Sequence, residues 1–126
     1  MNSSEYLCPK CKNPLRVDKH IILLAEKSDR QRGLLLFEPK LGDYNFLKHS
    51  SFSLKTGENL KFYCPICHAD LQTAEETFSE IILKETSGEI FAVRFSGRVG
   101  EQATYKMKEG QITEHFGTDS EKYFRQ

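Results

Sequence analysis

The chain has 126 residues, of which 38% are hydrophobic and 29% charged, and its formal net charge at pH 7 is zero. This length fits one domain, and the neutral balance lacks the basic excess of dedicated nucleic-acid binders. The longest apolar runs are far too short to cross a bilayer, and residues 1–5 lack the charged and apolar regions of a signal peptide. We therefore expect no membrane association and a cytoplasmic location.

The first half of the chain up to the second cysteine pair reads as short strands separated by polar turns. Its apolar runs are short and contain β-branched residues, which favours strands over helices. Five strands are predicted, the third and fourth more weakly than the others, at residues 16–26, 34–38, 44–47, 51–54 and 60–63. This long segment lacks the Pro/Ser-rich composition of a flexible linker, so we expect hairpins here.

The second half predicts a β-meander over residues 78–117. Its only helical tendency, at residues 72–76, suffices for one turn at most. Strands at 78–85 and 89–95 precede a hairpin of strands 103–108 and 111–116, whose two-residue Glu109-Gly110 loop favours a type I′-like turn. The register set by this loop pairs Met107 with Ile112, Tyr105 with Glu114 and Ala103 with Phe116.

All four cysteines lie in two matching stretches, Cys8-Pro9-Lys10-Cys11 and Cys64-Pro65-Ile66-Cys67. The match extends over residues 7–15 and 63–71, which align without a gap as an apolar residue, Cys-Pro-x-Cys, three residues and Leu. The two-residue spacing lets a tight turn aim both sulfurs at one point, and the proline fixes φ in that turn. Four thiolates in tetrahedral geometry suit Zn²⁺ and leave no coordination position open, so this repeat predicts one shared, structural metal site.

The paired Cys-Pro-x-Cys turns resemble the knuckles of the zinc-ribbon family, small β-rich domains in which two knuckles hold one zinc. The resemblance covers less than half of the chain. Many ribbon knuckles have Gly directly after the second Cys, where this chain has Lys12 and His68. The resemblance implies one zinc per chain and a β-rich domain. Together with the strands predicted above, it gives a mostly β fold with ribbon-like knuckles joined to antiparallel hairpins and little helix. We expect a single domain over residues 1–126. The ligands that the resemblance implies are Cys8, Cys11, Cys64 and Cys67.

Three alternatives for the cysteines stay open at this stage. Two disulfides are one, although a chain of this length can bury a core without them and carries no secretion signal. A Cys-Pro-x-Cys redox motif is another, but such motifs normally lie between a strand and a helix, and no clear helix follows either pair. Iron, held by similar knuckles in rubredoxin, is the third, because sulfur ligation alone does not distinguish it from zinc.

Other residues suggest less specific sites. His68 adjoins a cysteine but is expected to be an ordinary knuckle residue, and the other three histidines lack a diagnostic spacing. Phe62 and Tyr63 could stack on bases but are expected to pack in the core. The segment Gly97-Arg98-Val99-Gly100 lacks the context of a nucleotide-binding loop, and no nucleophile or acid/base pair is evident. We therefore do not expect an enzyme.

Charge is divided between the halves of the chain and gives the second functional hypothesis. Residues 1–63 contain 11 Lys and Arg against 7 Asp and Glu, and residues 64–126 contain 7 against 11. Mutual attraction of the halves within one fold, or simple solvation of the charges, would account for this division. The sequence thus favours a non-catalytic zinc-binding module for protein partners. The alternative is a nucleic-acid or ribonucleoprotein accessory that uses a basic patch near the first knuckle, formed by Lys10, Lys12, Arg16 and Lys19.

Overall fold

The computed structural model describes residues 4–74 and 77–120, and this part of the chain forms two antiparallel β-sheets and no helix. The predicted mostly β fold class is therefore confirmed. The strands are β1 (Glu5–Leu7), β2 (Arg16–Val17), β3 (His20–Glu26), β4 (Arg32–Phe37), β5 (Phe46–Lys48), β6 (Lys61–Tyr63), β7 (Phe78–Lys84), β8 (Ile90–Ser96), β9 (Thr104–Lys108) and β10 (Gln111–Phe116).

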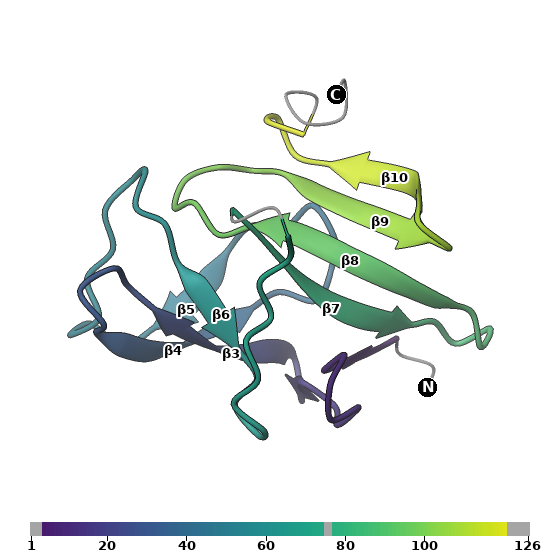
Figure 1. Cartoon of the computed structure of the whole chain (residues 1–126), viewed down its shortest axis with the longest axis horizontal. Coiled ribbons are helices and arrows are strands. Elements are labelled where there is room, and N and C mark those ends of the chain that lie inside the picture. The colour runs from purple at the N-terminus through teal and green to yellow at the C-terminus, as the bar shows by residue number, and fades with distance from the viewer. Residues whose placement is uncertain (1–3, 75–76, 121–126) are drawn as a thin grey trace.

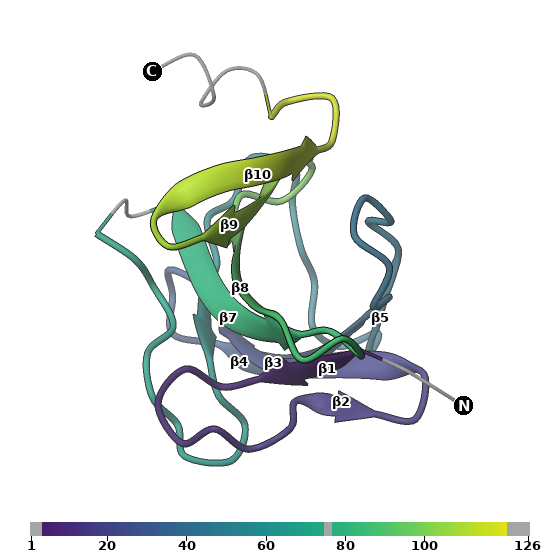
Figure 2. The same cartoon turned by 90° about the vertical axis from the view of Figure 1, so that its right-hand side faces the viewer.

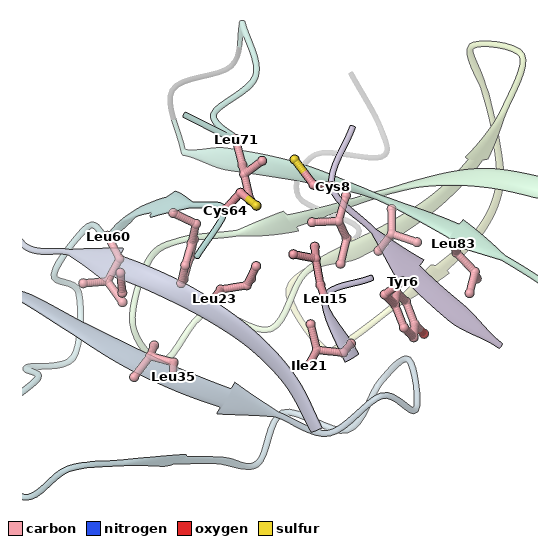
Figure 3. Packing of buried hydrophobic residues seen from close by; sticks show 14 of the residues in the cluster. Tyr6, Cys8, Leu15, Ile21, Leu23, Leu35, Leu60, Cys64, Leu71 and Leu83 are labelled. Carbon is pink, nitrogen blue, oxygen red and sulfur yellow. The ribbon is translucent and has the colours of Figure 1, made fainter. Parts of the chain in front are cut away.

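The two sheets face each other across a hydrophobic core (Figures 1 and 2). One sheet has the order β1-β7-β8-β9-β10, and the other has the order β2-β3-β4-β5 with β6 added beside β3. In β3, Ile21, Leu23 and Ala25 alternate with more exposed residues, as expected for a strand that buries one face. Both sheets contribute to this core, for example through Leu35 of β4 and Leu83 of β7 (Figure 3).

The strands before the knuckles are exchanged between the two halves. β1, which leads into the first knuckle, pairs with β7, with Tyr6 opposite Leu83. β6, which leads into the second knuckle, pairs with β3, with Phe62 opposite Ala25. Each half therefore completes the sheet of the other half.

The two halves repeat one backbone unit, residues 5–48 (the first unit) and residues 61–106 (the second unit). In the first unit, Leu23 pairs with Leu35 across the β3–β4 hairpin. In the second, Ile81 pairs with Val93 across the β7–β8 hairpin, so both partners lie 58 positions later in the sequence. The same shift of 58 relates the β4–β5 and β8–β9 registers. Exchange of the units maps every one of these pairings onto another, so the units are related by an approximate twofold.

The five-residue turns of the two hairpins also match. The backbone N–H of Lys27 donates to the carbonyl of Gln31 at 2.9 Å, as that of Glu85 does to the carbonyl of Glu89. Arg30 in the first turn and Gly88 in the second both have positive φ, 73° and 96°. The repeat therefore includes turn conformation as well as strand pairing.

Most predicted strands are present. The differences concern two predicted strands and the predicted helical turn. The predicted strand at 16–26 is two strands, β2 and β3, that pair with each other. The predicted strand at 51–54 is wrong, because the Phe52 ring folds back onto Gly33, where a Cβ atom would lie 2.6 Å from the ring. In the predicted helical turn, Gln72 forms a β-bridge with Ser79, and residues 75 and 76 lie outside the described residues.

The register of the β9–β10 hairpin is correct only near its loop. Met107 lies opposite Ile112 as predicted, but a bulge follows Ile112. Beyond it, His115 lies opposite Tyr105 and Phe116 opposite Thr104, so the predicted pairs Tyr105–Glu114 and Ala103–Phe116 are wrong. The hydroxyl of the bulge residue Thr113 donates to the carbonyl of Lys106 at 3.1 Å, which stabilises the inserted residue.

Candidate metal centre

The two knuckles, residues 7–15 and 63–71, have the same hydrogen bonds. In the first, the N–H groups of Lys10 and Cys11 donate to the Cys8 sulfur at 3.3 and 3.4 Å. In the second, the N–H groups of Ile66 and Cys67 donate to the Cys64 sulfur at the same distances. Each turn is closed by an N–H bond back to the carbonyl of its first cysteine, at 2.9 Å in both. Such donors spread the charge of a thiolate, so both turns are built for charged sulfur.

Leucines join each knuckle to its sheet in the same way. The Leu15 N–H donates to the carbonyl of Tyr6 at 2.7 Å, and its carbonyl accepts from Ile22 in β3. The Leu71 N–H donates to the carbonyl of Phe62 at 2.9 Å, and its carbonyl accepts from Glu80 in β7. Both leucines are buried in the core, which fixes the knuckles on the sheets.

The fold brings all four cysteine sulfurs together, within 4.8 Å of one another. Cys8 lies 3.8 Å from Cys67, and Cys11 lies 3.8 Å from Cys64, measured between the sulfurs. A tetrahedron with Zn–S bonds of about 2.3 Å has sulfur–sulfur edges of about 3.8 Å. The two short distances therefore fit a tetrahedral thiolate site, and all four thiols are free rather than joined in disulfides.

Burial and pKa are divided unevenly within the cluster. Cys8 and Cys64, the first cysteines of the two turns, are fully buried beside Leu71 at one end of the core (Figure 3), whereas Cys67 is exposed. Burial raises the pKa of the Cys64 thiol to about 12. Hydrogen bonding from the backbone N–H of Asn13 lowers the pKa of Cys11 to about 6. A buried thiolate needs a compensating positive charge, and the donor set fits a thiophilic divalent cation that would supply it.

The residue after each second cysteine adopts a left-handed backbone. Lys12 has a φ of 63° and His68 a φ of 65°, a region that costs side-chain-bearing residues about 1–2 kcal/mol. Glycine is free of this cost, which explains why glycine suits this position in ribbon knuckles. The chain thus keeps the knuckle conformation with two less favourable residues.

We expect His68→Gly to stabilise the protein by about 0.5–1 kcal/mol. Glycine removes the backbone strain at this positive φ, and this relief exceeds the cost of the added entropy of the unfolded chain. Thermal unfolding with the metal content held equal measures the effect. Lys10→Gly is the matched control. Lys10 is not among the residues with positive φ, so its replacement by glycine should lower the stability of the protein. A lower melting temperature for His68→Gly would contradict the proposed backbone strain at His68.

The other candidate residues do not join the cysteines. Within the described residues the metal-ligand group contains the four cysteines and no histidine. Phe62 is buried in the core, and the Tyr63 hydroxyl donates to the Glu26 carboxylate at 3.1 Å. In the basic patch, Arg16 donates to the carbonyls of Ser4 and Asp18, so its guanidinium holds the backbone near the first knuckle.

A second feature, absent from the sequence predictions, is a cavity of about 240 Å³ between the sheets. Its apolar lining comes from equivalent positions of the two units, such as Phe37 and Phe95. Equivalent loops, residues 38–45 and 96–103, flank it, and each has a positive-φ glycine, Gly42 or Gly100. The signal in the sequence was the repeated pattern Phe-x-x-Lys/Arg-Leu/Val-Gly-Asp/Glu at residues 37–43 and 95–101.

No protein-family model matches the chain, and comparisons with curated proteins and with solved structures also gave no match. Within the described residues, no helix is long and apolar enough to span a membrane. The functional conclusion therefore rests on the geometry of the site.

Proposed function

We propose that Cys8, Cys11, Cys64 and Cys67 hold one zinc ion per chain, with a structural role. The supporting observation is the pair of 3.8 Å sulfur–sulfur distances, each of which joins a cysteine of one knuckle to a cysteine of the other. When bound, zinc would neutralise the thiolates and link the two units across their approximate twofold. A complete thiolate shell leaves no position for a substrate or a water molecule, so the proposed role is not catalytic.

The protein is proposed to act as a binding module for protein partners in a reducing compartment such as the cytoplasm. Free thiols and a thiolate metal site suit such a compartment. The absence of an open metal position favours binding over chemistry. Nucleic acid is the competing partner, and Lys10, Lys12 and Lys19 would be the exposed cations of that surface.

Metal analysis of the purified protein tests the proposed site. We expect one zinc per chain by native mass spectrometry and elemental analysis, and slow alkylation of all cysteines until a chelator is added. Protein that is isolated without metal, or that reacts rapidly at one cysteine while metallated, would contradict the structural role. A red protein that contains iron would show that the same four cysteines hold iron rather than zinc.

A gel shift at several salt concentrations distinguishes the two kinds of partner. We expect no salt-dependent complex with RNA or DNA, because the chain has no net positive charge. A complex that weakens with salt and is lost in a Lys10→Glu/Lys19→Glu variant would instead establish the nucleic-acid function.

A further inference from the structure

The strands β5 and β9 occupy the same position in the two units, but only β9 is covered. β10 pairs along the outer edge of β9. In the part of the chain that the structure describes, no strand pairs with the outer edge of β5 (Figures 1 and 2). After β5 the chain turns away, and Gly57 and Leu60 hydrogen-bond with Val99 and Gly97 of the second unit. The first unit thus lacks the strand that completes the second.

The backbone groups at this edge are arranged as in β9. The Glu38 N–H donates to the carbonyl of Asn45 at 3.4 Å, as the Ser96 N–H does to the carbonyl of Ala103 at 3.0 Å. Hydrogen-bonded pairs alternate along an antiparallel ladder, so the N–H and C=O groups of Phe46 and Lys48 point away from β4. These groups form a template for another strand.

The side chains around β5 differ from their equivalents in the second unit. Leu47 is 56% exposed, whereas the equivalent Tyr105 of β9 is 6% exposed. On the outer face of the sheet, Ile22 lies opposite Leu36. At the equivalent positions of the other sheet, Glu80 forms an ion pair with Arg94 at 2.8 Å. The same backbone therefore tolerates a polar outer face, and its aliphatic character beside β5 points to a covering partner.

Charge indicates what the covering segment carries. Lys106 of β9 lies opposite Glu114 of β10, with 3.4 Å between ammonium and carboxylate. Lys106 also pairs with Glu85 at 2.8 Å. Lys48 is the equivalent of Lys106, and Lys27 stands at the position of Glu85. Lys48 has no acidic partner among the described residues, so an incoming strand would supply the missing carboxylate.

The inner side of the edge is apolar as well. Phe46, at 39% exposure, lines the cavity between the sheets and packs against Phe37 in a tilted arrangement at a ring-centroid distance of 5.8 Å. A strand added beside β5 would place alternate side chains over Leu47 on one face and near Phe46 on the other.

We infer that the outer edge of β5 binds an extended segment of a protein partner by strand addition. The segment has aliphatic or aromatic side chains on both faces and an acidic residue opposite Lys48. Main-chain hydrogen bonds give this mode its affinity, and alternate side chains give its specificity. The inference rests on the proposed function as a protein-binding module and locates the surface that this function uses.

Two eight-residue peptides test the edge, one copying residues 110–117 and one in which Thr113→Val and His115→Val make it more apolar. Each is titrated to millimolar concentration into the ¹⁵N-labelled, metal-loaded protein. We expect amide shifts at Phe46, Leu47 and Lys48, and roughly fivefold tighter binding of the apolar peptide. Lys48→Pro removes an edge-facing N–H without removing a ladder bond to β4, so it should abolish binding while the spectrum stays dispersed.

Matched variants separate the contribution of main-chain hydrogen bonds to peptide binding from that of the Lys48 charge. Lys48→Ala keeps the N–H and should weaken binding only about two- to fivefold, whereas Lys48→Glu should weaken it further. A peptide in which the acidic residue becomes Lys should recover binding to Lys48→Glu, which main-chain pairing alone does not explain.

Three outcomes would overturn the inference. The first is the absence of shifts at β5 with either peptide. The second is shifts confined to β9 and β10, which would show exchange with the chain's own strand. The third is concentration-dependent shifts at β5 without peptide that Lys48→Pro removes, which would make a second copy the occupant. Metal content is measured on the same sample. A failure of this inference can therefore be distinguished from a failure of the proposed zinc site.

Discussion

Replacing Cys64 by serine is expected to release the proposed zinc ion and to lower the free energy of unfolding by more than about 4 kcal/mol. Cys64 is fully buried and accepts two backbone N–H bonds, so a serine leaves three thiolates and a buried hydroxyl in a site sized for sulfur. For a chain of this length the change corresponds to a fall in melting temperature of roughly 15 °C. Calorimetry and elemental analysis of the same preparation measure both effects.

The same knuckle contains the control. Ile66 lies between the two cysteines of the second knuckle and is 54% exposed, so Ile66→Ser should keep the proposed zinc ion and nearly all of the stability. Because the knuckles are equivalent, Cys8→Ser should reproduce the loss caused by Cys64→Ser. A Cys64→Ser protein that retains one zinc and melts within about 2 °C of the wild type would contradict the structural role.

Cutting the chain between Lys55 and Thr56 is expected to leave two fragments that do not fold separately. Fragment 1–55 retains β3 without β6, and fragment 56–126 retains β7 without β1. Each fragment also has only two of the four cysteines. We expect disordered NMR spectra for each fragment alone, and a dispersed spectrum after the two are mixed with one equivalent of zinc.

This experiment also tests the expected single domain over residues 1–126. A fragment 56–126 that shows dispersed amide signals for β7 and β8 on its own would establish two independent units. Mixing the fragments without zinc is the control for the metal. Partial recovery there would measure how much the exchanged strands contribute without the ion.

The four-cysteine cluster could be predicted from sequence because the geometry of each cysteine turn is local. The two-residue spacing of Cys8 and Cys11 fixes one turn, and its repetition at Cys64 and Cys67 implies a shared centre. The long strands were predictable for a similar reason, since alternation along β7 and β8 reports burial of one face. The bulge in β10 was not, because it depends on a hydroxyl bond from Thr113 to the facing strand.

Strand exchange could not be predicted, because it joins segments that are distant in sequence. Glu5 pairs with Lys84, and nothing in either strand's pattern specifies that partner. The full repeat was concealed by a two-residue insertion between Gln72 and Ser79, which changes the shift between the units from 56 to 58. The outer faces have also diverged, with Leu36 in one unit and Arg94 in the other, so side chains conceal what the backbone retains.

The exchange of β1 and β6 also determines when the protein can fold during synthesis. The first knuckle leaves the ribosome well before the second, since 52 residues separate Cys11 from Cys64. At about 5–20 residues per second, that separation takes roughly 3–10 seconds. Throughout this interval Cys8 and Cys11 are two thiols without their partners. β2 covers only the start of one edge of β3, so the edge at residues 24–26 stays open until β6 pairs with it. We therefore expect the nascent first half to need reduced thiols and protection of that edge until the second knuckle emerges.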